Sequence, residues 1–393
     1  MTARVSCILV GVGLTFASAV ASVDAQSLYN AAGLGVPVEA LDGRARALGN
    51  LGIGLQGGSF MPTDPGALGR LSVSTGVMAA QPSWIDYEVD GVAGSIQGTR
   101  FPLLGLAYPL LSGMMSVQIG SVLDQRYTAT TTGLIDIGTG PVPKTDEFEQ
   151  TGSISNVNFG FSRMFGEHLS GGVTLGRYTG SSVRSLTRTY GDDTVTLEDV
   201  DAYEERGEWS YGAYSFTAGA ALDLGSSTRI AASVQVPSQL DATATDETRG
   251  SDRSYRLPVQ YRVGASMSLG AALVLTGSAQ LADWAGAQDG LVGAAFAGKT
   301  NGYGVGVELS RARVLGKNAP LRFGFRRTGL PFSFDEGGAT ERVISGGFGL
   351  ELNRTGNIVL AGVDLAIERG RRSGVGLDEK FWRATISLLA SGL

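Results

Sequence analysis

The chain has 393 residues with 59 glycines, 12 prolines and one cysteine, and charged residues make up 17% of it. The net charge is −6 and the basic residues form no cluster, which argues against nucleic acid as a partner. A single cysteine excludes an intramolecular disulfide. After the N-terminus, no apolar run reaches the length of a transmembrane helix.

Residues 1–25 have the pattern of a secretory signal peptide. Arg4 provides the positive charge, residues 5–16 are apolar, and small residues precede Gln26. Cleavage after Ala25 is the first expectation and cleavage after Ala21 the second. The apolar run is too short for a membrane anchor. We therefore expect an exported protein.

Residues 26–70 are rich in glycine and end in a stretch with two prolines, MPTDPG. Residues 40–48 have the composition of a short helix, and the glycines and prolines beyond them favour compact turns. Because the segment is hydrophobic, we do not expect it to extend into solvent. It is predicted to pack inside the domain that follows, as an N-terminal hatch.

From residue 71 to 393 the chain alternates between apolar and polar residues in short segments. In residues 381–389, for example, Trp382, Ala384 and Ile386 share one face, while Arg383 and Thr385 share the other. The pattern predicts strands over 72–90, 99–110, 114–130, 151–165, 168–190, 208–224, 227–240, 255–269, 271–283, 299–311, 319–329, 340–352, 356–369 and 379–390.

The connections between these segments alternate strictly between short and long. Long polar connections are expected at 131–150, 191–207, 241–254, 284–298, 330–339 and 370–378, with a shorter one at 91–98. This regular sorting is typical of outer-membrane barrels, which have tight periplasmic turns and longer external loops. The predicted fold is therefore an all-β, transmembrane antiparallel β-barrel of about 14 strands, with the hatch in its lumen.

Several partners follow from this prediction. A barrel in the bacterial outer membrane meets the lipid bilayer and lipopolysaccharide, and we expect the barrel-assembly machinery to insert it. Trp and Tyr residues near the long loops are interpreted as an outer girdle at the membrane surface. The alternative is that aromatic residues are simply common in strands. The residues in question are Trp84, Tyr87, Tyr127, Trp209, Tyr211, Tyr255, Trp284 and Trp382.

Residue patterns for catalysis are sparse. His168 is the only histidine and falls in a predicted tight turn, so a histidine-based triad or a multi-histidine metal site is excluded. The acidic residues at 191–208 could bind a divalent cation, but a solvated external loop is the favoured interpretation. We expect no enzymatic activity, no cofactor and no bound metal.

Charged residues on the inward face of the late strands form a second group of interest. Both signs are present, so they are expected to pair and brace the lumen. The alternative is a guide for the polar head of an amphipathic ligand. By alternation, this lumen charge network consists of Arg262, Glu308, Arg322, Arg326, Asp364, Glu368 and Arg383.

The hatch contributes two more cations, Arg44 and Arg46, in a segment of small and apolar residues. If the segment lies in the lumen, both guanidinium groups need carboxylates, for which Glu308, Asp364 and Glu368 are candidates. The alternative leaves both arginines solvated at the periplasmic rim.

The hatch and two late stretches resemble the FadL-like family of outer-membrane transporters. Residues 43–54 (GRARALGNLGIG) and 63–68 (TDPGAL) are similar to the stretches that precede the first strand of these proteins, and residues 321–332 and 381–386 are similar to their later strands. Asp64-Pro65-Gly66 stands in place of their usual Asn-Pro-Ala, and the chain ends in Leu393 rather than an aromatic residue.

This resemblance implies a fourteen-stranded barrel with a hatch, in which Arg44, Arg46, Asp64 and Pro65 are candidate hatch or ligand residues. It also implies passive uptake or binding of small hydrophobic or amphipathic molecules such as long-chain fatty acids. Related barrels serve secretion systems, so the alternative function is a barrel that docks a protein partner through its external loops.

Overall fold

The structure, a computed structural model, describes residues 27–57, 60–89, 91–136, 138, 140–191, 201–245, 248, 250–291, 295–314, 317–355 and 358–392. The expected signal peptide lies outside these residues, as do residues 192–200 of the acidic stretch at 191–208. Within the described parts of the chain, no helix is long and apolar enough to cross a membrane.

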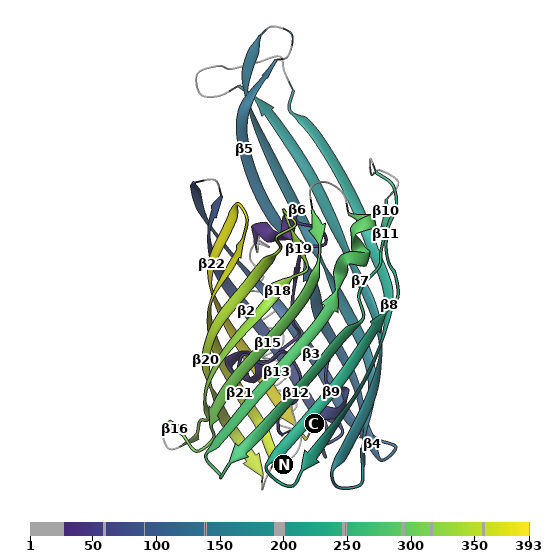
Figure 1. The fold of residues 1–393 in the computed structure, drawn as a ribbon, viewed down its shortest axis with the longest axis vertical. Helices are drawn as coiled ribbons and strands as arrows, with labels where there is room; N and C mark the ends of the chain where they lie inside the picture. Colours follow the sequence, from purple (N-terminus) through teal and green to yellow (C-terminus); the bar gives the residue numbers. More distant parts are fainter. Residues whose placement is uncertain are drawn as a thin grey trace, which may run out of the picture.

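Fourteen antiparallel strands close into a barrel, which confirms the predicted fold class. Each strand pairs with its neighbour in sequence, and β2 closes the ring by pairing with β22 (Figure 1). The strands are β2 (Thr75–Val89), β3 (Val92–Leu110), β4 (Gly113–Asp124), β6 (Pro141–Phe165), β7 (Leu169–Tyr190), β8 (Tyr203–Leu224), β9 (Thr228–Pro237), β12 (Gln260–Leu269), β13 (Leu273–Asp283), β15 (Lys299–Leu309), β18 (Leu321–Leu330), β20 (Ala339–Thr355), β21 (Ile358–Gly374) and β22 (Leu377–Ser391).

Short strands continue or decorate this wall. After two-residue interruptions, β5 (Tyr127–Asp136) continues β4 along β6, and β10 (Leu240–Ala244) continues β9 along β8. β11 (Arg253–Tyr255) precedes β12 and pairs with β10. The remaining pieces are η3 (Trp284–Gly290), the pair β14 (Phe296–Ala297) and β19 (Phe332–Ser333), and the hairpin β16 (Arg313–Val314) and β17 (Lys317–Asn318).

Three of the predicted long loops are largely strand, and one of them is 370–378, where β21 runs to Gly374 and β22 begins at Leu377. β5 and β6 continue through most of 131–150, and β3 begins at Val92, inside the connection predicted at 91–98. The loop predictions are wrong here because a polar stretch does not by itself indicate irregular structure. Thr130, Thr131 and Thr132 are polar but β-branched, and such residues fit a strand exposed on both faces.

The outer and inner surfaces of the barrel follow the alternation in the sequence. Along β3 and β4, exposed apolar side chains such as Leu104, Leu106 and Val117 point outward, whereas Ser116 and Gln118 are buried inside. A wall that is apolar outside and polar inside is suited to a lipid bilayer, where closure also satisfies every backbone hydrogen-bonding group.

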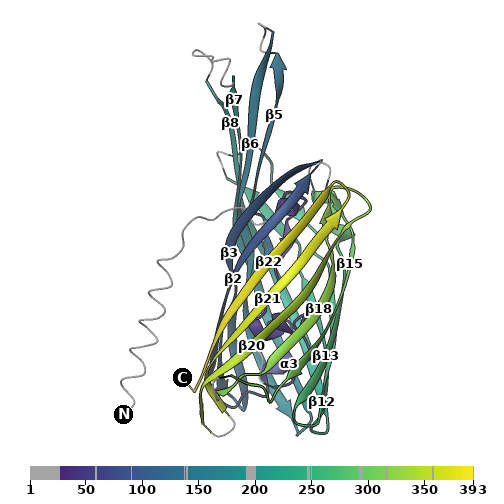
Figure 2. The same ribbon diagram turned by 90° about the vertical axis from the view of Figure 1, so that its left-hand side faces the viewer.

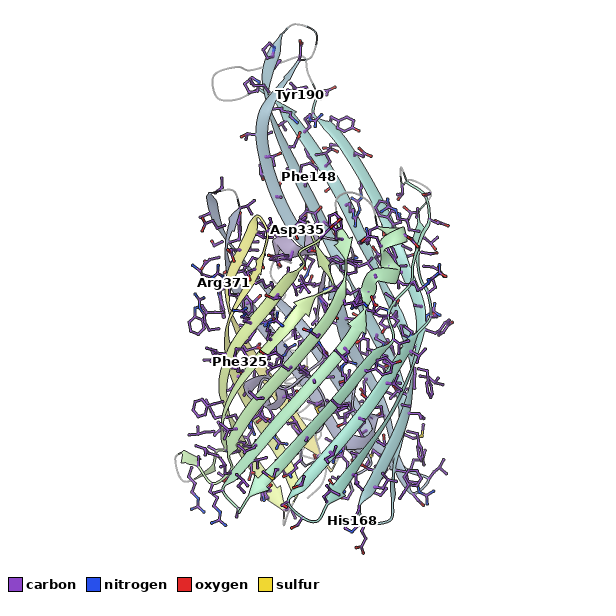
Figure 3. All side chains as sticks on the ribbon, in the orientation of Figure 1. Phe148, His168, Tyr190, Phe325, Asp335 and Arg371 are labelled. Carbon is purple, nitrogen blue, oxygen red and sulfur yellow. The ribbon has the colours of Figure 1, made fainter. Side chains whose placement is uncertain are left out.

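Four strands rise far above the rest of the rim. The upper parts of β5, β6, β7 and β8 form one projecting sheet, which we call the wing (Figures 1 and 2). Asp146 braces it by binding both Lys144, at 2.5 Å, and Arg188, at 2.5 Å, across β6 and β7. Phe148 and Tyr190 also lie on the wing (Figure 3).

The hatch occupies the lumen. It contains η2 (Leu28–Ala31), β1 (Val36–Pro37), α2 (Gly43–Ala47) and α3 (Pro65–Leu68), and most of its side chains are buried. Leu41, Ala45, Leu48, Met61 and Ala67 form a small apolar core within it. The short elements α2 and α3 cannot be stable alone, so their packing against the wall holds them in place.

Glycines of the wall allow the hatch backbone to approach closely. A Cβ at Gly304 would lie 1.9 Å from the carbonyl oxygen of Gly49, and one at Gly324 would lie 2.3 Å from the amide nitrogen of Gly49. Gly49 itself has a φ of 60°, which glycine adopts without strain. The glycine alternation in β15 therefore makes room for the hatch.

Candidate functional site

The hatch is joined to the late strands by a first group of ion pairs around Glu308. Arg44 Nε lies 3.0 Å from one Glu308 oxygen, and Arg322 Nε lies 2.8 Å from the same oxygen. Arg322 also binds Asp364 on β21. The structure thus brings four of the sequence-predicted site residues together in one chain of alternating charges, near the end of the lumen opposite the wing.

A second and more buried group lies around Glu341. Its carboxylate binds Arg326 at 3.0 Å, Arg372 at 2.8 Å and Arg383 at 2.9 Å, and all of these side chains are less than one-tenth exposed. Glu368 contributes further contacts, 2.9 Å to Arg326 and 3.4 Å to Arg383. Removing one partner from such a buried cluster leaves an uncompensated charge, which is strongly destabilising.

This second group continues into the hatch at both ends. Arg46 lies 3.6 Å from Glu39, whose carboxylate also lies 3.9 Å from Arg326. Arg372 binds Glu379, which accepts hydrogen bonds from the Ser27 hydroxyl and the Leu28 amide. Arg46 is fully buried, and this burial lowers its pKa to about 10. It therefore stays protonated at neutral pH.

Asp64 and Pro65 lie on the opposite side of the hatch. One oxygen of the buried Asp64 carboxylate accepts a hydrogen bond from the Gly54 amide at 3.0 Å, and burial raises the pKa of this group. The Pro65 carbonyl accepts from the Ser162 hydroxyl on β6. Both residues shape the hatch backbone and lie outside the cavity described next.

A cavity of about 140 Å³ lies between the hatch and the wall. Apolar side chains such as Leu41, Leu123 and Trp284 line part of it, and amides of Asn156 and Gln280 line another part. This combination suits a ligand that is largely apolar but carries a polar group.

Two arginines in this cavity differ from those of the ion-pair groups. Arg100 Nε donates to the Gln81 amide oxygen at 2.7 Å, and Arg262 donates to the Gln260 amide oxygen at 2.7 Å. Within the described parts of the chain, neither has a carboxylate within ion-pair distance. Because their fixed partners are neutral, these two cations are available to an anionic group in the cavity.

The wall itself opens beside this cavity. β3 and β4 are paired only in one region, which runs from Leu103 opposite Gly120 to Leu110 opposite Gly113. Above Gly120 the edge of β4 pairs instead with β1 of the hatch, where Val36 and Pro37 lie opposite Asp124 and Leu123. Residues from both separated strands line the cavity, and Figure 2 shows β2 and β3 diverging from the wing.

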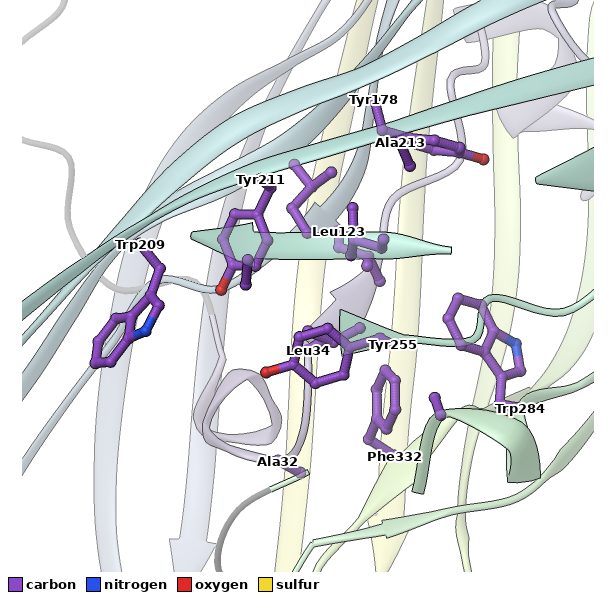
Figure 4. Close-up of a cluster of buried hydrophobic side chains, with 14 residues drawn as sticks. Ala32, Leu34, Leu123, Tyr178, Trp209, Tyr211, Ala213, Tyr255, Trp284 and Phe332 are labelled. Atoms are coloured by element: carbon purple, nitrogen blue, oxygen red, sulfur yellow. The ribbon is translucent and has the colours of Figure 1, made fainter. Parts of the chain in front are cut away.

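An aromatic cluster occupies the end of the lumen nearest the wing. It includes Trp209, Tyr211, Tyr255, Trp284 and Phe332, packed around Leu34 of the hatch (Figure 4). The predicted outer girdle is therefore wrong for the first four of these residues, which point inward. Trp84 and Trp382, by contrast, are about half exposed on the outside. Proximity to a loop does not reveal the face, because only the register does.

The sequence interpretation missed several residues of the site. These are Glu39, Arg100, Glu341, Arg372 and Glu379. Alternation could have identified Arg372 and Glu379, since they share a face with Glu368 and Arg383, the predicted inward residues of their own strands. Glu341 lies on β20, for which no inward residue was predicted. No linear pattern marks Glu39 or Arg100, because their positions depend on how the hatch folds and where β3 turns inward.

His168 lies in the turn between β6 and β7 at the end of the barrel opposite the wing (Figure 3). Among the described residues, no group of three or more histidine, cysteine or acidic side chains is arranged to bind a metal ion.

No family model matches the chain, and no curated protein matches it. Solved structures do match. They include a Pseudomonas aeruginosa FadL homologue (13% identity, TM-score 0.65, covering 91% of this chain and 100% of that one), the Pseudomonas putida toluene transporter TodX (12%, 0.57, 91% and 99%) and the monoaromatic hydrocarbon channel CymD (14%, 0.53, 91% and 98%). The chain has the fold of these proteins, and the resemblance to FadL-like barrels seen in the sequence is confirmed at that level.

Proposed function

We propose that the protein is an outer-membrane channel for passive uptake of hydrophobic and amphipathic molecules, and that long-chain carboxylates such as fatty acids are among its ligands. The hatch fills the lumen, which excludes an open aqueous pore through the described residues. Similar folds belong to a FadL homologue, a toluene transporter and a monoaromatic hydrocarbon channel.

The observation that carries the proposal is that one cavity combines an apolar lining with two arginines that have no carboxylate within ion-pair distance among the described residues. Leu41, Leu51 and Leu123 provide apolar surface for a hydrocarbon chain. Arg100 and Arg262 provide charge-assisted hydrogen bonds for a carboxylate. A channel for pure hydrocarbons has no need of either cation, so their presence favours an amphipathic ligand.

The route follows from the same geometry. The aromatic cluster lies at the external end, and its rings offer a surface on which an apolar ligand can first bind. The cavity then borders the gap between β3 and β4, where the wall lacks pairing. A hydrophobic ligand leaving through this gap stays out of water and reaches the bilayer, whereas small polar solutes gain nothing from it.

The test compares oleate with its methyl ester. We expect Arg100→Gln and Arg262→Gln to weaken oleate binding by about tenfold or more, measured by fluorescence of the purified protein, because each removes a hydrogen bond to a charged group. Binding of methyl oleate should be unchanged. Arg354→Gln, an exposed substitution outside the cavity, is the matched control. Equal loss for acid and ester would contradict the carboxylate assignment.

Cell assays test uptake itself. Labelled oleate should enter cells that express the protein faster than cells without it, and the Arg100→Gln variant should reduce this difference. We also propose that the signal peptide exports the protein, that the barrel-assembly machinery inserts it and that it contacts lipopolysaccharide. The proposal includes no covalent chemistry. His168, exposed in a turn at the far end, supports the last point.

The wing supports a second candidate function, the docking of a protein partner. Among the described residues, its edge strand β5 pairs only with β6, so within that part of the chain the other side of residues 127–136 presents unpaired backbone groups outside the barrel. Deleting the wing, which means the upper parts of β5, β6, β7 and β8, while keeping their barrel portions distinguishes the two functions. Oleate uptake should persist if the channel function is right, and should be lost if docking is required.

A further inference from the structure

The outer face of β18, β20, β21 and β22 carries a row of cations in register. Arg327 lies opposite Arg342, Arg342 opposite Arg371, and Arg371 opposite Lys380. Directly paired residues of an antiparallel sheet share a face, so these four side chains form one horizontal row, which we call the cationic row. The acidic Asp86 on β2 lies opposite Lys380 at the end of this row. Arg342, Arg371 and Lys380 are exposed.

Such a row is unfavourable unless something anionic lies on it. Neighbouring strands are about 4.8 Å apart, and like charges placed directly opposite each other destabilise a sheet. Among the described residues, Arg342 and Lys380 have no hydrogen bond or ion pair. Arg371 pairs with Asp378 at 3.0 Å, and Arg327 has only a 3.4 Å contact with Asn301. Asp86 lies opposite Lys380 and Asp378 pairs with Arg371, so among the described residues Arg327 and Arg342 are the cations of the row with no carboxylate paired with them or opposite them.

The rows above and below place the cationic row at the boundary of the bilayer. The row below it contains Phe325, Ile344, Arg369, Trp382 and Trp84, in which Arg369 lies over the Trp382 ring at 5.1 Å. One row further down, the outward residues include Phe323 and Ile367, and both are exposed. Aromatic side chains favour the membrane surface, and apolar ones favour the acyl region.

The row above the cations is polar and has no basic residue. It contains Thr340, Ser373, Asp378 and Glu88. The sequence of environments from below upward is therefore apolar, aromatic, cationic and then polar or acidic. Figure 3 shows Arg371 above Phe325 and near the rim that carries the long loops. This is the depth of the headgroups in the external leaflet.

We propose that the cationic row is a binding site for the phosphorylated glucosamine headgroup of lipopolysaccharide. The inference rests on the outer-membrane location proposed above, with the long loops outside. The row spans three strand spacings, about 14 Å, which is wide enough for a headgroup with more than one phosphate. Arginine and lysine provide charge-assisted hydrogen bonds to the phosphates, and the apolar rows below contact the acyl chains.

The test uses full-length protein purified in detergent, without divalent cations, and measures lipid binding by native mass spectrometry. The wild type should bind diphosphorylated lipid A more tightly than its dephosphorylated form. In the variant Arg342→Gln/Lys380→Gln, affinity for the diphosphorylated lipid should fall roughly 30-fold, because each basic residue near a charged lipid surface contributes about 1 kcal/mol. The control Arg311→Gln/Arg354→Gln changes two exposed cations at the opposite end and should bind like the wild type.

Competition identifies the source of the phosphate. Inorganic phosphate and phosphatidylglycerol should fail to displace diphosphorylated lipid A at equal concentration. Complete displacement by either one would overturn the assignment to a multiply phosphorylated glycolipid, and unchanged affinity in the double variant would overturn the site. The variant Arg342→Gln/Lys380→Gln should keep normal oleate binding, because both side chains face outward. The proposed oleate channel and the proposed lipid site are therefore tested by separate measurements, and either can fail without the other.

Discussion

The two sides on which the hatch meets the barrel use different chemistry. On one side, α2 packs against β18, β20, β21 and β22, where Arg44 binds Glu308 and Arg46 joins the group around Glu341 through Glu39. On the other side, α3 packs against β6, β7 and β8 through neutral contacts, such as the Ser162 hydroxyl with the Pro65 carbonyl, and we call this α3 contact the neutral side. The ion pair between Arg70 and Asp223 on β8 follows α3 in the chain and is a charged contact beside it.

The neutral side is held by shape and the charged side by pairing. At α3, a Cβ on Gly172 would lie 2.5 Å from the Pro65 carbonyl oxygen, so the glycine leaves just enough space for the backbone. At α2, close approach occurs too, but buried charges must also find partners. We therefore expect substitutions on the charged side to act through uncompensated charge, and those on the neutral side through steric fit or single hydrogen bonds.

The largest effect is expected at Glu341, because three arginines share its carboxylate. Glu341→Gln should leave buried guanidinium groups without a counter-charge and lower the free energy of unfolding by about 3–5 kcal/mol. Urea unfolding in lipid vesicles, followed by the change in electrophoretic mobility, measures this. Lys299→Gln removes an exposed ion pair at 3.6 Å and should change stability by less than about 1 kcal/mol. Similar effects of both variants would show that the buried group does not brace the barrel.

A somewhat smaller effect is expected where the hatch backbone touches β15. In Gly304→Ala the new methyl group would overlap the Gly49 carbonyl, and the closed barrel cannot move away. The hatch should shift, and ion conductance in planar bilayers should rise while the barrel stays folded. Gly277→Ala on β13 is the matched control, since no atom lies within 4 Å of its added Cβ. A low, wild-type conductance in Gly304→Ala would indicate that this contact does not seat the hatch.

The sequence predicted the barrel well because alternation and loop sorting repeat over the whole domain, so local errors average out. The inward face of Glu308, Arg322 and Arg383 followed from the same period of two. Partner choice did not follow, because it depends on the register between neighbouring strands, which the alternation does not fix. Arg326 and Arg372, for example, meet on Glu341 from two different strands.

The cavity was the least predictable part. Its cations Arg100 and Arg262 come from opposite parts of the chain, and only the latter was expected to point inward. The inward aromatic cluster was likewise hidden, because Trp209 and Tyr211 could face lipid or lumen with equal plausibility until their register was known. Sites built by a folded-in segment leave no linear motif.

A moderate effect is expected when the charged contacts of α2 are removed. Arg44→Ala/Arg46→Ala deletes the hydrogen bonds of Arg44 to Glu308 and to the Gln56 carbonyl, and should loosen the hatch and raise conductance. The counterpart on the neutral side is Ser162→Ala/Ser233→Ala, which removes hydroxyl contacts to Pro65 and Thr63 and should raise it less. The comparison between the two sides fails if the serine variant conducts as much as the arginine variant.

The smallest effect concerns pH and the N-cap of α2. Asp42 is buried and accepts a hydrogen bond from the Ala45 amide at 2.7 Å. Burial, with help from the nearby Asp364, raises its pKa to about 6 from 3.8, although Arg44 and Arg322 oppose the shift. Between these two values the seated hatch keeps a proton that a solvated hatch would release, so seating weakens as pH rises through this window and is weakest above pH 6.

Conductance should therefore be lower at pH 5 than at pH 7. Asp42→Asn keeps the N-cap acceptor but cannot ionise, so it should hold conductance at the low value across this range and strengthen seating at pH 7 by at most about 3 kcal/mol, from 1.36 kcal/mol per pKa unit. The neutral side of the hatch lacks such a titrating cap, because Asp64 makes no side-chain cap to α3. If Asp42→Asn conducts as the wild type does at every pH, the ionisation of Asp42 does not control the charged side of the hatch.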